Sequence, residues 1–395
     1  MKKFSYRHTI AACCTGYITQ SAVNNFVPLL FTTFNSTFGI PMTKITVLIT
    51  INFCIQLFID LISAKVVDRI GYRTGMVIAH IFAGAGLALL AVLPQTMPDP
   101  FVGILICVFL YAIGGGLLEV LVSPIVEACP GENKAAVMGL LHSFYCWGTV
   151  AVILISTLFF TVFGRENWRI MAVIWALLPF ANCIFFTKVP INTLTEDGEG
   201  LSIGTLCKTK IFALFVVLML CSGAAEQSIS QWASTFAEKG LGITKTLGDL
   251  LGPCLFSVFM GTARIIYSKL SIKLPIYRLL IVSGVLCIAS YLTASLANNE
   301  IVSLVGCAFC GFSVGAMWPG VFSIAGEKLP TGGTTMFALL ALAGDMGCAG
   351  GPTLVGFLSD AFDGNMKTAL LFAIIFPAVL IIGCIMLRKK KNTAR

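Results

Sequence analysis

Four carboxylates lie inside long apolar stretches of the chain: Asp60, Glu119, Glu226 and Asp345. An ionised acid at the centre of an apolar membrane helix costs about 2.5–3.5 kcal/mol on insertion scales, so acids at such positions generally serve a function. Their available chemistry is to take up and release a proton, to hold a cation, or to accept hydrogen bonds from a polar ligand. We therefore expect these four acids to act in proton or ion coupling.

Uncharged polar groups accompany the acids at similar depths. Asn52, Gln56 and Asp60 recur every four residues, which places them on one helix face. Amide, hydroxyl and aromatic groups suit the hydroxyl edges and apolar faces of a sugar. The candidate substrate-binding residues are Gln20, Asn24, Asn25, Asn52, Gln56, His142, Tyr145, Gln227, Gln231, Trp232 and Trp318.

Three of these candidates have an alternative interpretation. His142 lies at about the depth of Glu119, where it either pairs with that acid or packs as a neutral ring. Trp232 and Trp318 either line a cavity or sit at a membrane interface, where Trp is enriched. Arg264 lies near the end of an apolar segment, and we expect it to anchor that end of the helix.

The composition identifies the elements that carry these residues. Of the 395 residues, 57% are hydrophobic and only 11% are charged. An ordinary soluble domain has about 25% charged residues, most of them on its surface. The composition therefore predicts a multi-pass helical membrane protein in a lipid bilayer. It excludes a soluble enzyme and a nucleic-acid-binding protein.

Twelve apolar segments are long enough to cross about 30 Å of hydrocarbon, which takes roughly 20 helical residues. They lie at 8–34, 44–66, 74–94, 101–128, 134–162, 168–187, 211–237, 246–268, 276–296, 301–326, 333–359 and 368–387. The predicted fold class is an all-α membrane protein with twelve transmembrane helices. We expect two six-helix bundles, 1–189 and 211–395, joined by a linker at 190–210.

The basic residues predict the orientation. With twelve spans, 20 of the 26 Lys and Arg residues fall on the side of both termini and six on the other side. Because Lys and Arg are enriched in cytoplasmic loops, both termini and the linker are expected in the cytoplasm. The basic-then-apolar start, MKKFSYRHTIAACC, is interpreted as part of the first span, because no small-residue cleavage site follows it.

The two bundles carry similar sequences. IVEACPGENKAAVMGLL is followed 200 residues later by SIAGEKLPTGGTTMFALL, which aligns Glu127 with Glu327. A second alignment, at an offset of 206, places Gln20 and Asn24 opposite Glu226 and Ser230. The pattern predicts parallel six-helix repeats with a binding site near the midplane.

No motif indicates a metal or a cofactor. Most of the 15 cysteines lie in apolar segments, where a thiol behaves as a small hydrophobic group. Cys307 and Cys310 form a CxxC without a second pair or a His cluster, so we expect no metal site. The glycines at 114–116 and 344–351 are expected to let helices approach closely. No Gly-Lys-Ser/Thr follows the first of these runs, so it is not a phosphate-binding loop.

The loop after the second predicted span is SAKVVDRIGYRTG, with Asp68, Arg69, Gly71 and Arg73. It resembles the signature loop of the major facilitator superfamily, Gly-x-x-x-Asp-Arg-x-Gly-Arg-Arg, with Ala64 at the first Gly. The resemblance implies a cytoplasmic gating loop in which Asp68 accepts hydrogen bonds at a helix end and pairs with an Arg, latching the two halves. Positive-inside topology alone would explain the Arg residues but not the Asp and Gly.

Three further stretches, SAVNNFVPLL, GGGLLEVLVSPIVEA and LLHSFYCWG, resemble the fucose/galactose/glucose proton symporter group and the related sodium-dependent glucose transporter-like branch. The matching residues are Asn24, Asn25, Glu119, Pro124, His142, Phe144 and Tyr145. Ser123 replaces the Asn before Pro in that group, and Cys146 replaces a Gly. The first-span Asp of several proton symporters falls near Val27 or Pro28 here, so their two-carboxylate scheme does not carry over directly.

The sequence therefore predicts a secondary active transporter, not an enzyme, that moves a small polar solute, in particular a sugar, through the cytoplasmic membrane by alternating access. The resemblance favours proton symport through Glu119, and sodium coupling is a variant. The chain is expected to act as a monomer without a cofactor, driven by a proton or sodium gradient.

Two other functions remain as alternatives. A drug/proton antiporter usually has a Gly-rich stretch ending in Gly-Pro in the fifth span, which reads GLLHSFYCWGTVAVILIS here. A sensor built on a transporter scaffold would be expected to add long cytoplasmic segments.

Overall fold

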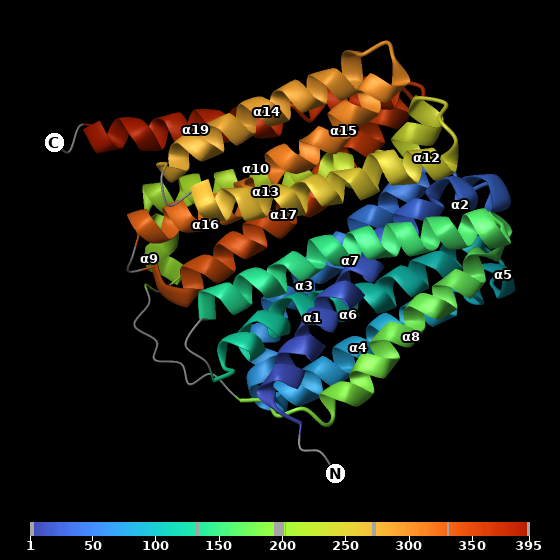
Figure 1. The fold of residues 1–395 in the computed structure, drawn as a ribbon, viewed down its shortest axis with the longest axis horizontal. Coiled ribbons are helices and arrows are strands. Elements are labelled where there is room, and N and C mark those ends of the chain that lie inside the picture. Colours follow the sequence, from blue (N-terminus) through green and yellow to red (C-terminus); the bar gives the residue numbers. More distant parts are fainter. Residues whose placement is uncertain are drawn as a thin grey trace. The chain divides into compact units, whose positions relative to one another are not determined.

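The computed structural model describes residues 4–130, 134–192, 201, 203–270, 274–329 and 332–392 (Figure 1). The regular elements in this part of the chain are all helical, which confirms the predicted all-α class. The chain divides into two compact units, Met1–Glu196 and Asp197–Arg395.

The first unit is a helical bundle in which α4 packs between α6 and α8, and α1 packs against α6, α7 and α8. The helix α3 lies against α6. The elements are α1 (Tyr6–Asn25), η1 (Val27–Leu30), α2 (Phe31–Phe38), α3 (Met42–Ile70), α4 (Tyr72–Leu90), α5 (Leu93–Thr96), α6 (Pro100–Glu127), α7 (Lys134–Phe163), η2 (Arg165–Asn167) and α8 (Trp168–Phe186).

In the second unit, α10 packs along α17 and α19, while α14 and α13 both pack against α15. The elements are α9 (Ile203–Lys208), α10 (Lys210–Ser230), α11 (Ala233–Thr235), η3 (Phe236–Gly240), α12 (Lys245–Asp249), η4 (Leu250–Cys254), α13 (Leu255–Leu270), α14 (Ile276–Leu296), α15 (Glu300–Val314), α16 (Met317–Lys328), α17 (Gly333–Ala361), α18 (Met366–Phe372) and α19 (Ile375–Asn392). Several predicted spans are thus interrupted helices, and both η3 and η4 are π-helical turns.

Ten helical stretches in the described residues are long and apolar enough to cross a membrane. They correspond to ten of the twelve predicted spans. The other two predicted spans, 8–34 and 333–359, fall on helices as well. The first is divided at η1, next to Pro28, and the second is rich in glycine and contains Asp345, which lowers its hydropathy. The count of twelve and the cytoplasmic position of the termini stay predictions.

Side-chain caps and a glycine fix the ends of several helices. Asp99 accepts a hydrogen bond from the Phe101 backbone N–H at 2.9 Å and starts α6, with Pro100 in the first helical position. At the turn between α3 and α4, Gly71 has φ 78°, a left-handed conformation that a residue with a Cβ rarely adopts. This glycine of the predicted gating loop is therefore required by the backbone.

Glycines let α10 and α17 approach closely, as the sequence predicted for the run at 344–351. A Cβ added at Gly347 would collide with the Leu220 carbonyl of α10, and one added at Gly351 would lie 2.6 Å from the Ala224 carbonyl oxygen. Gly223 of α10 faces the backbone of Gly344 in the same way. The absence of side chains at these positions brings the polar residues of the two helices close together.

Candidate functional site

Four candidate residues of the first unit lie on α3 and α6, which pack against each other: Asn52, Gln56, Asp60 and Glu119. A Cβ added at Gly116 would lie 3.0 Å from the Cα of Gln56, and one added at Gly115 would lie 3.3 Å from the amide carbon of the same residue. Only glycine permits this approach without displacing Gln56. The glycines of α6 therefore hold the polar face of α3 against the helix that carries Glu119.

Asn24 joins α1 to this polar face. Its Oδ1 accepts hydrogen bonds from Nδ2 of Asn52 at 3.2 Å and from Nε2 of Gln56 at 2.8 Å. All three side chains are buried. Two members of the polar row predicted on α3 thus face α1, and they meet there a residue that the sequence had singled out separately.

Glu119 is the centre of a second contact in this unit. Its Oε2 accepts a hydrogen bond from Nε2 of Gln20 at 2.7 Å. A carboxylate oxygen of Asp60 lies within 4.8 Å of a carboxylate oxygen of Glu119. Two nearby carboxylates disfavour being ionised together, so the pair favours the binding of a proton or a cation. We call Gln20, Asp60 and Glu119 the acid cluster.

His142 pairs with a tyrosine that the sequence did not single out. The rings of His142 and Tyr17 have centroids 5.4 Å apart, and the Tyr17 hydroxyl lies 3.4 Å from Nδ1 of His142. The same hydroxyl lies 3.1 Å from Oγ of Ser123, one turn after Glu119 on α6. His142 is thereby connected to the helix of Glu119 through Tyr17. The spacing of aromatic residues along α1 alone gave no sign of this contact.

Asn25 and Tyr145 take part in the contact between α1 and α7. Asn25 donates from Nδ2 to the Ser21 carbonyl at 3.0 Å and to Oγ1 of Thr149 at 3.3 Å. The backbone carbonyl of Tyr145 accepts a hydrogen bond from the Ser21 hydroxyl at 2.7 Å. The amide nitrogen of Asn25 and the main-chain carbonyl of Tyr145 therefore take part in bonds that connect α1 to α7.

In the second unit, the candidate residues of α10 form a chain of hydrogen bonds that ends at an arginine. Gln231 donates from Nε2 to Oε1 of Gln227 at 3.1 Å, and Gln227 donates from Nε2 to Oε1 of Glu226 at 3.2 Å. The other carboxylate oxygen of Glu226 lies 4.0 Å from Nη2 of Arg264 on α13. The sequence expectation that Arg264 only anchors a helix end therefore missed its ion pair with a buried acid.

The remaining candidates of this unit either contact α17 or belong to it. Trp232 is 1% exposed and donates from Nε1 to the Pro352 carbonyl at 2.9 Å, which ties the segment between α10 and α11 to α17. The ring of Trp318 lies against Gly344, where an added Cβ would collide with it. Asp345 follows Gly344 and is buried in the middle of α17.

The gating loop is described at two of its four predicted residues. The side chains of Asp68 and Arg69 lie outside the described residues. Arg73 donates from Nη1 to the Phe186 carbonyl at 2.6 Å and from Nη2 to the Val189 carbonyl at 2.8 Å. It therefore satisfies carbonyl groups at the C-terminal end of α8, where a cation is also favoured by the helix dipole.

We expect Arg73→Ala to lower the melting temperature of the purified protein, because two carbonyls at the end of α8 lose their donor. The free energy of unfolding should fall by only about 1 kcal/mol, because the arginine is exposed. Arg7→Ala, at another exposed arginine, is the matched control. Equal melting temperatures for the two variants would show that these bonds do not contribute.

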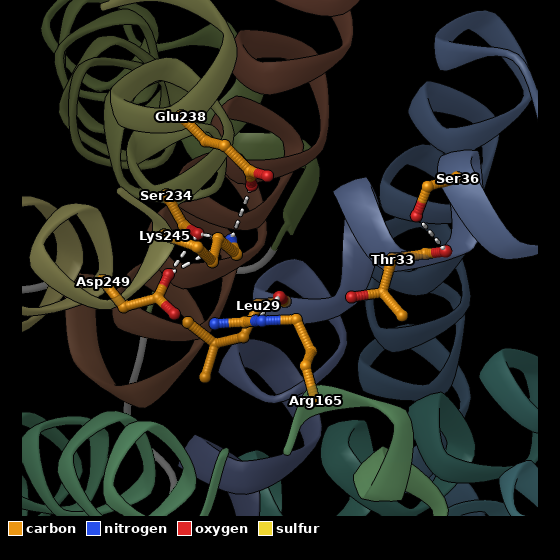
Figure 2. Close-up of polar contacts among 8 residues, drawn as sticks. All are labelled: Leu29, Thr33, Ser36, Arg165, Ser234, Glu238, Lys245 and Asp249. Carbon is orange, nitrogen blue, oxygen red and sulfur yellow. Dashed lines mark hydrogen bonds and ion pairs between the residues drawn. The ribbon is translucent and has the colours of Figure 1, made fainter. Parts of the chain in front are cut away.

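A group of charged residues in the second unit was missed by the sequence reasoning (Figure 2). Nζ of Lys245 lies 3.1 Å from Oδ1 of Asp249 and 3.7 Å from Oε2 of Glu238. The Ser234 hydroxyl accepts a hydrogen bond from Lys245 and donates one to Asp249. Asp249 is 0% exposed. We call these four residues the lysine cluster. The spacing of four between Lys245 and Asp249 was the available signal.

Comparisons with known proteins agree with this architecture. The model of the Major Facilitator Superfamily matches residues 11–352. The chain belongs to this superfamily and is a multi-pass membrane transporter. The match confirms the resemblance found in the sequence.

Individual relatives are distant. "Membrane protein MosC" of Rhizobium meliloti is 23% identical over 279 residues, which span 70% of this chain and 66% of that protein. The crystal structure of the E. coli fucose:proton symporter FucP matches with a TM-score of 0.67 and 17% identity, over 95% of this chain and 98% of that one. The nucleoside transporter NupG matches with a TM-score of 0.74 and 14% identity, over 96% and 99%. A bacterial homologue of the human lysosomal transporter Spinster has a TM-score of 0.76 and 12% identity, over 98% of both chains. At these identities the structures establish a shared fold.

Proposed function

We propose that this transporter moves a small polar solute of the sugar class through the cytoplasmic membrane by alternating access, together with a proton that binds at Glu119. The observation that carries the proposal is the acid cluster, in which Glu119 accepts a 2.7 Å hydrogen bond from Gln20 beside a second acid, Asp60. A carboxyl group held in this way can bind a proton without leaving its position.

Protonation of Glu119 would change the electrostatics of the first unit. A neutral carboxyl group no longer repels the Asp60 carboxylate, and it costs less than an ion in apolar surroundings. The hydrogen bond from Gln20 can persist, because the protonated group still accepts through its carbonyl oxygen. We propose that the state carrying both proton and solute is the one that changes conformation.

The amide groups support a hydroxylated solute. Asn24, Asn52 and Gln56 in the first unit, and Gln227 and Gln231 in the second, each combine donors and acceptors of the kind that pair with hydroxyl groups. FucP is named as a symporter of fucose and NupG as a nucleoside transporter. Both of these solutes carry several hydroxyl groups, which is consistent with the sugar class proposed here.

We also propose a role for the gating loop. Arg73 fixes the start of α4 to the end of α8 within the first unit. We assign to Asp68 the latch between the two halves that the signature loop implies. This latch would favour one orientation of the transporter until solute and proton have bound.

Uptake into proteoliposomes tests the proposed function. Purified protein should accumulate a member of a sugar panel when a proton gradient, acidic outside, is imposed. A sodium gradient at fixed pH should give no accumulation. Accumulation that follows sodium alone would establish the sodium-coupled variant and overturn proton symport. Efflux of a lipophilic cation driven by the proton gradient would instead establish the drug/proton antiporter.

A further inference from the structure

Two candidate residues of the first unit each have a buried amide oxygen that accepts no hydrogen bond within the described part of the chain: Oε1 of Gln20 and Oδ1 of Asn52. The two side chains are 2% and 5% exposed, respectively. A buried acceptor without a donor costs about 1–3 kcal/mol, so each of these oxygens is a place where a ligand's donor would be stabilising.

One of these oxygens lies at the acid cluster. The Gln20 amide is fixed there by its own nitrogen, which donates to Glu119. The amide therefore presents its unsatisfied oxygen close to a pair of carboxylates whose oxygens lie within 4.8 Å of each other. While both acids are ionised, every oxygen of this cluster is an acceptor. A neutral hydroxyl supplies only one donor, whereas an ammonium group supplies three donors and a positive charge.

We infer that the acid cluster binds the protonated amino group of an amino-substituted polyol, such as an amino sugar, which is therefore the solute class of this transporter. The inference rests on the proposed function, because it names the solute that the proposed transport cycle carries. The ammonium group lies between Asp60 and Gln20, and Glu119 carries the coupled proton. Hydroxyl groups of the same solute extend along α3 toward Asn52.

The charge of an ammonium group favours this assignment. A positive charge beside Asp60 and Glu119 reduces the repulsion between the two carboxylates, which a neutral hydroxyl group cannot do.

Matched pairs of sugars test this inference by binding to the purified full-length protein. Glucosamine with glucose, and galactosamine with galactose, differ only in an ammonium group against a hydroxyl, and N-acetylglucosamine keeps the nitrogen without its charge. In at least one pair the amino sugar should bind about tenfold more tightly than its neutral partner, and the N-acetyl form should lose this advantage.

Asp60→Asn should abolish the preference for the amino sugar, and a cooperative melting transition in detergent shows that the variant is folded. Asp360→Asn, at an exposed acid near the end of α17, is the control and should keep the preference. Equal affinities within every pair, or an unchanged preference in Asp60→Asn, would overturn the inference.

Three further outcomes separate this inference from other accounts. If sodium chloride in place of choline chloride stabilises the wild type without any solute, and Asp60→Asn removes that effect, the cluster binds sodium and the inference is wrong. If neutral sugars accumulate under a proton gradient and amino sugars neither accumulate nor compete, the proposed function stands and the inference fails. If no sugar of either kind is bound or accumulated, the proposed function itself fails.

Discussion

Glu119→Gln should abolish accumulation of the solute against its gradient, so that the internal concentration does not rise above the external one, because the proton gradient is no longer coupled to transport. Glutamine has nearly the same shape as glutamic acid and can still accept the hydrogen bond from Gln20, so the binding site should remain formed. It cannot take up or release a proton. Exchange of labelled for unlabelled solute at equal concentrations should therefore persist, since exchange needs no net proton movement.

The measurement is uptake of labelled solute into proteoliposomes under an imposed proton gradient, with exchange measured in the same preparation. Glu300→Gln, at an exposed acid in the first turn of α15, is the control and should accumulate solute like the wild type. A Glu119→Gln protein that still concentrates solute normally would remove this residue from the coupling role.

The largest expected effect on stability is that of Lys245→Met. Asp249 is fully buried, and the substitution removes its lysine partner at 3.1 Å. Removing one partner of a buried ion pair typically costs about 3–5 kcal/mol, because the other charge remains in a poorly solvating environment. We expect a clear fall in the melting temperature in detergent. Lys208→Met, at an exposed lysine of α9, is the matched control.

The double variant Lys245→Met with Asp249→Asn shows whether the lost ion pair is the cause. It removes both charges and keeps an acceptor for the Ser234 hydroxyl. We expect it to be more stable than Lys245→Met alone, because neighbouring substitutions in one ion pair are not additive. If the two substitutions simply add, the lysine cluster does not act as a coupled unit.

The sequence predicted the helices and the family well, because both depend on local signals. Apolar length and the charge at span ends identify membrane helices, and the α3 row at intervals of four residues identified the face that meets Asn24. The loop with Gly71 carried the family resemblance that the superfamily match confirmed. These signals are read from residues close together in the chain.

The sequence could not predict which residues meet across helices. The depth of Arg264, counted from its span end, suggested an anchor, yet a long side chain reaches the buried Glu226 on another helix. Tyr17 was missed because only the packing of α1 against α7 brings it to His142. A hydropathy profile averages over a whole span, so it shows neither the break at η1 beside Pro28 nor the π-helical turn at η3.

The central claim is that Glu119 carries a proton together with the solute, and the pH inside proteoliposomes tests it most directly. With a pH-sensitive dye in the lumen and no initial pH gradient, addition of external solute should acidify the lumen of wild-type vesicles as solute enters. Glu119→Gln vesicles should show no acidification. Solute entry without luminal acidification in the wild type, or equal acidification in both proteins, would contradict the claim.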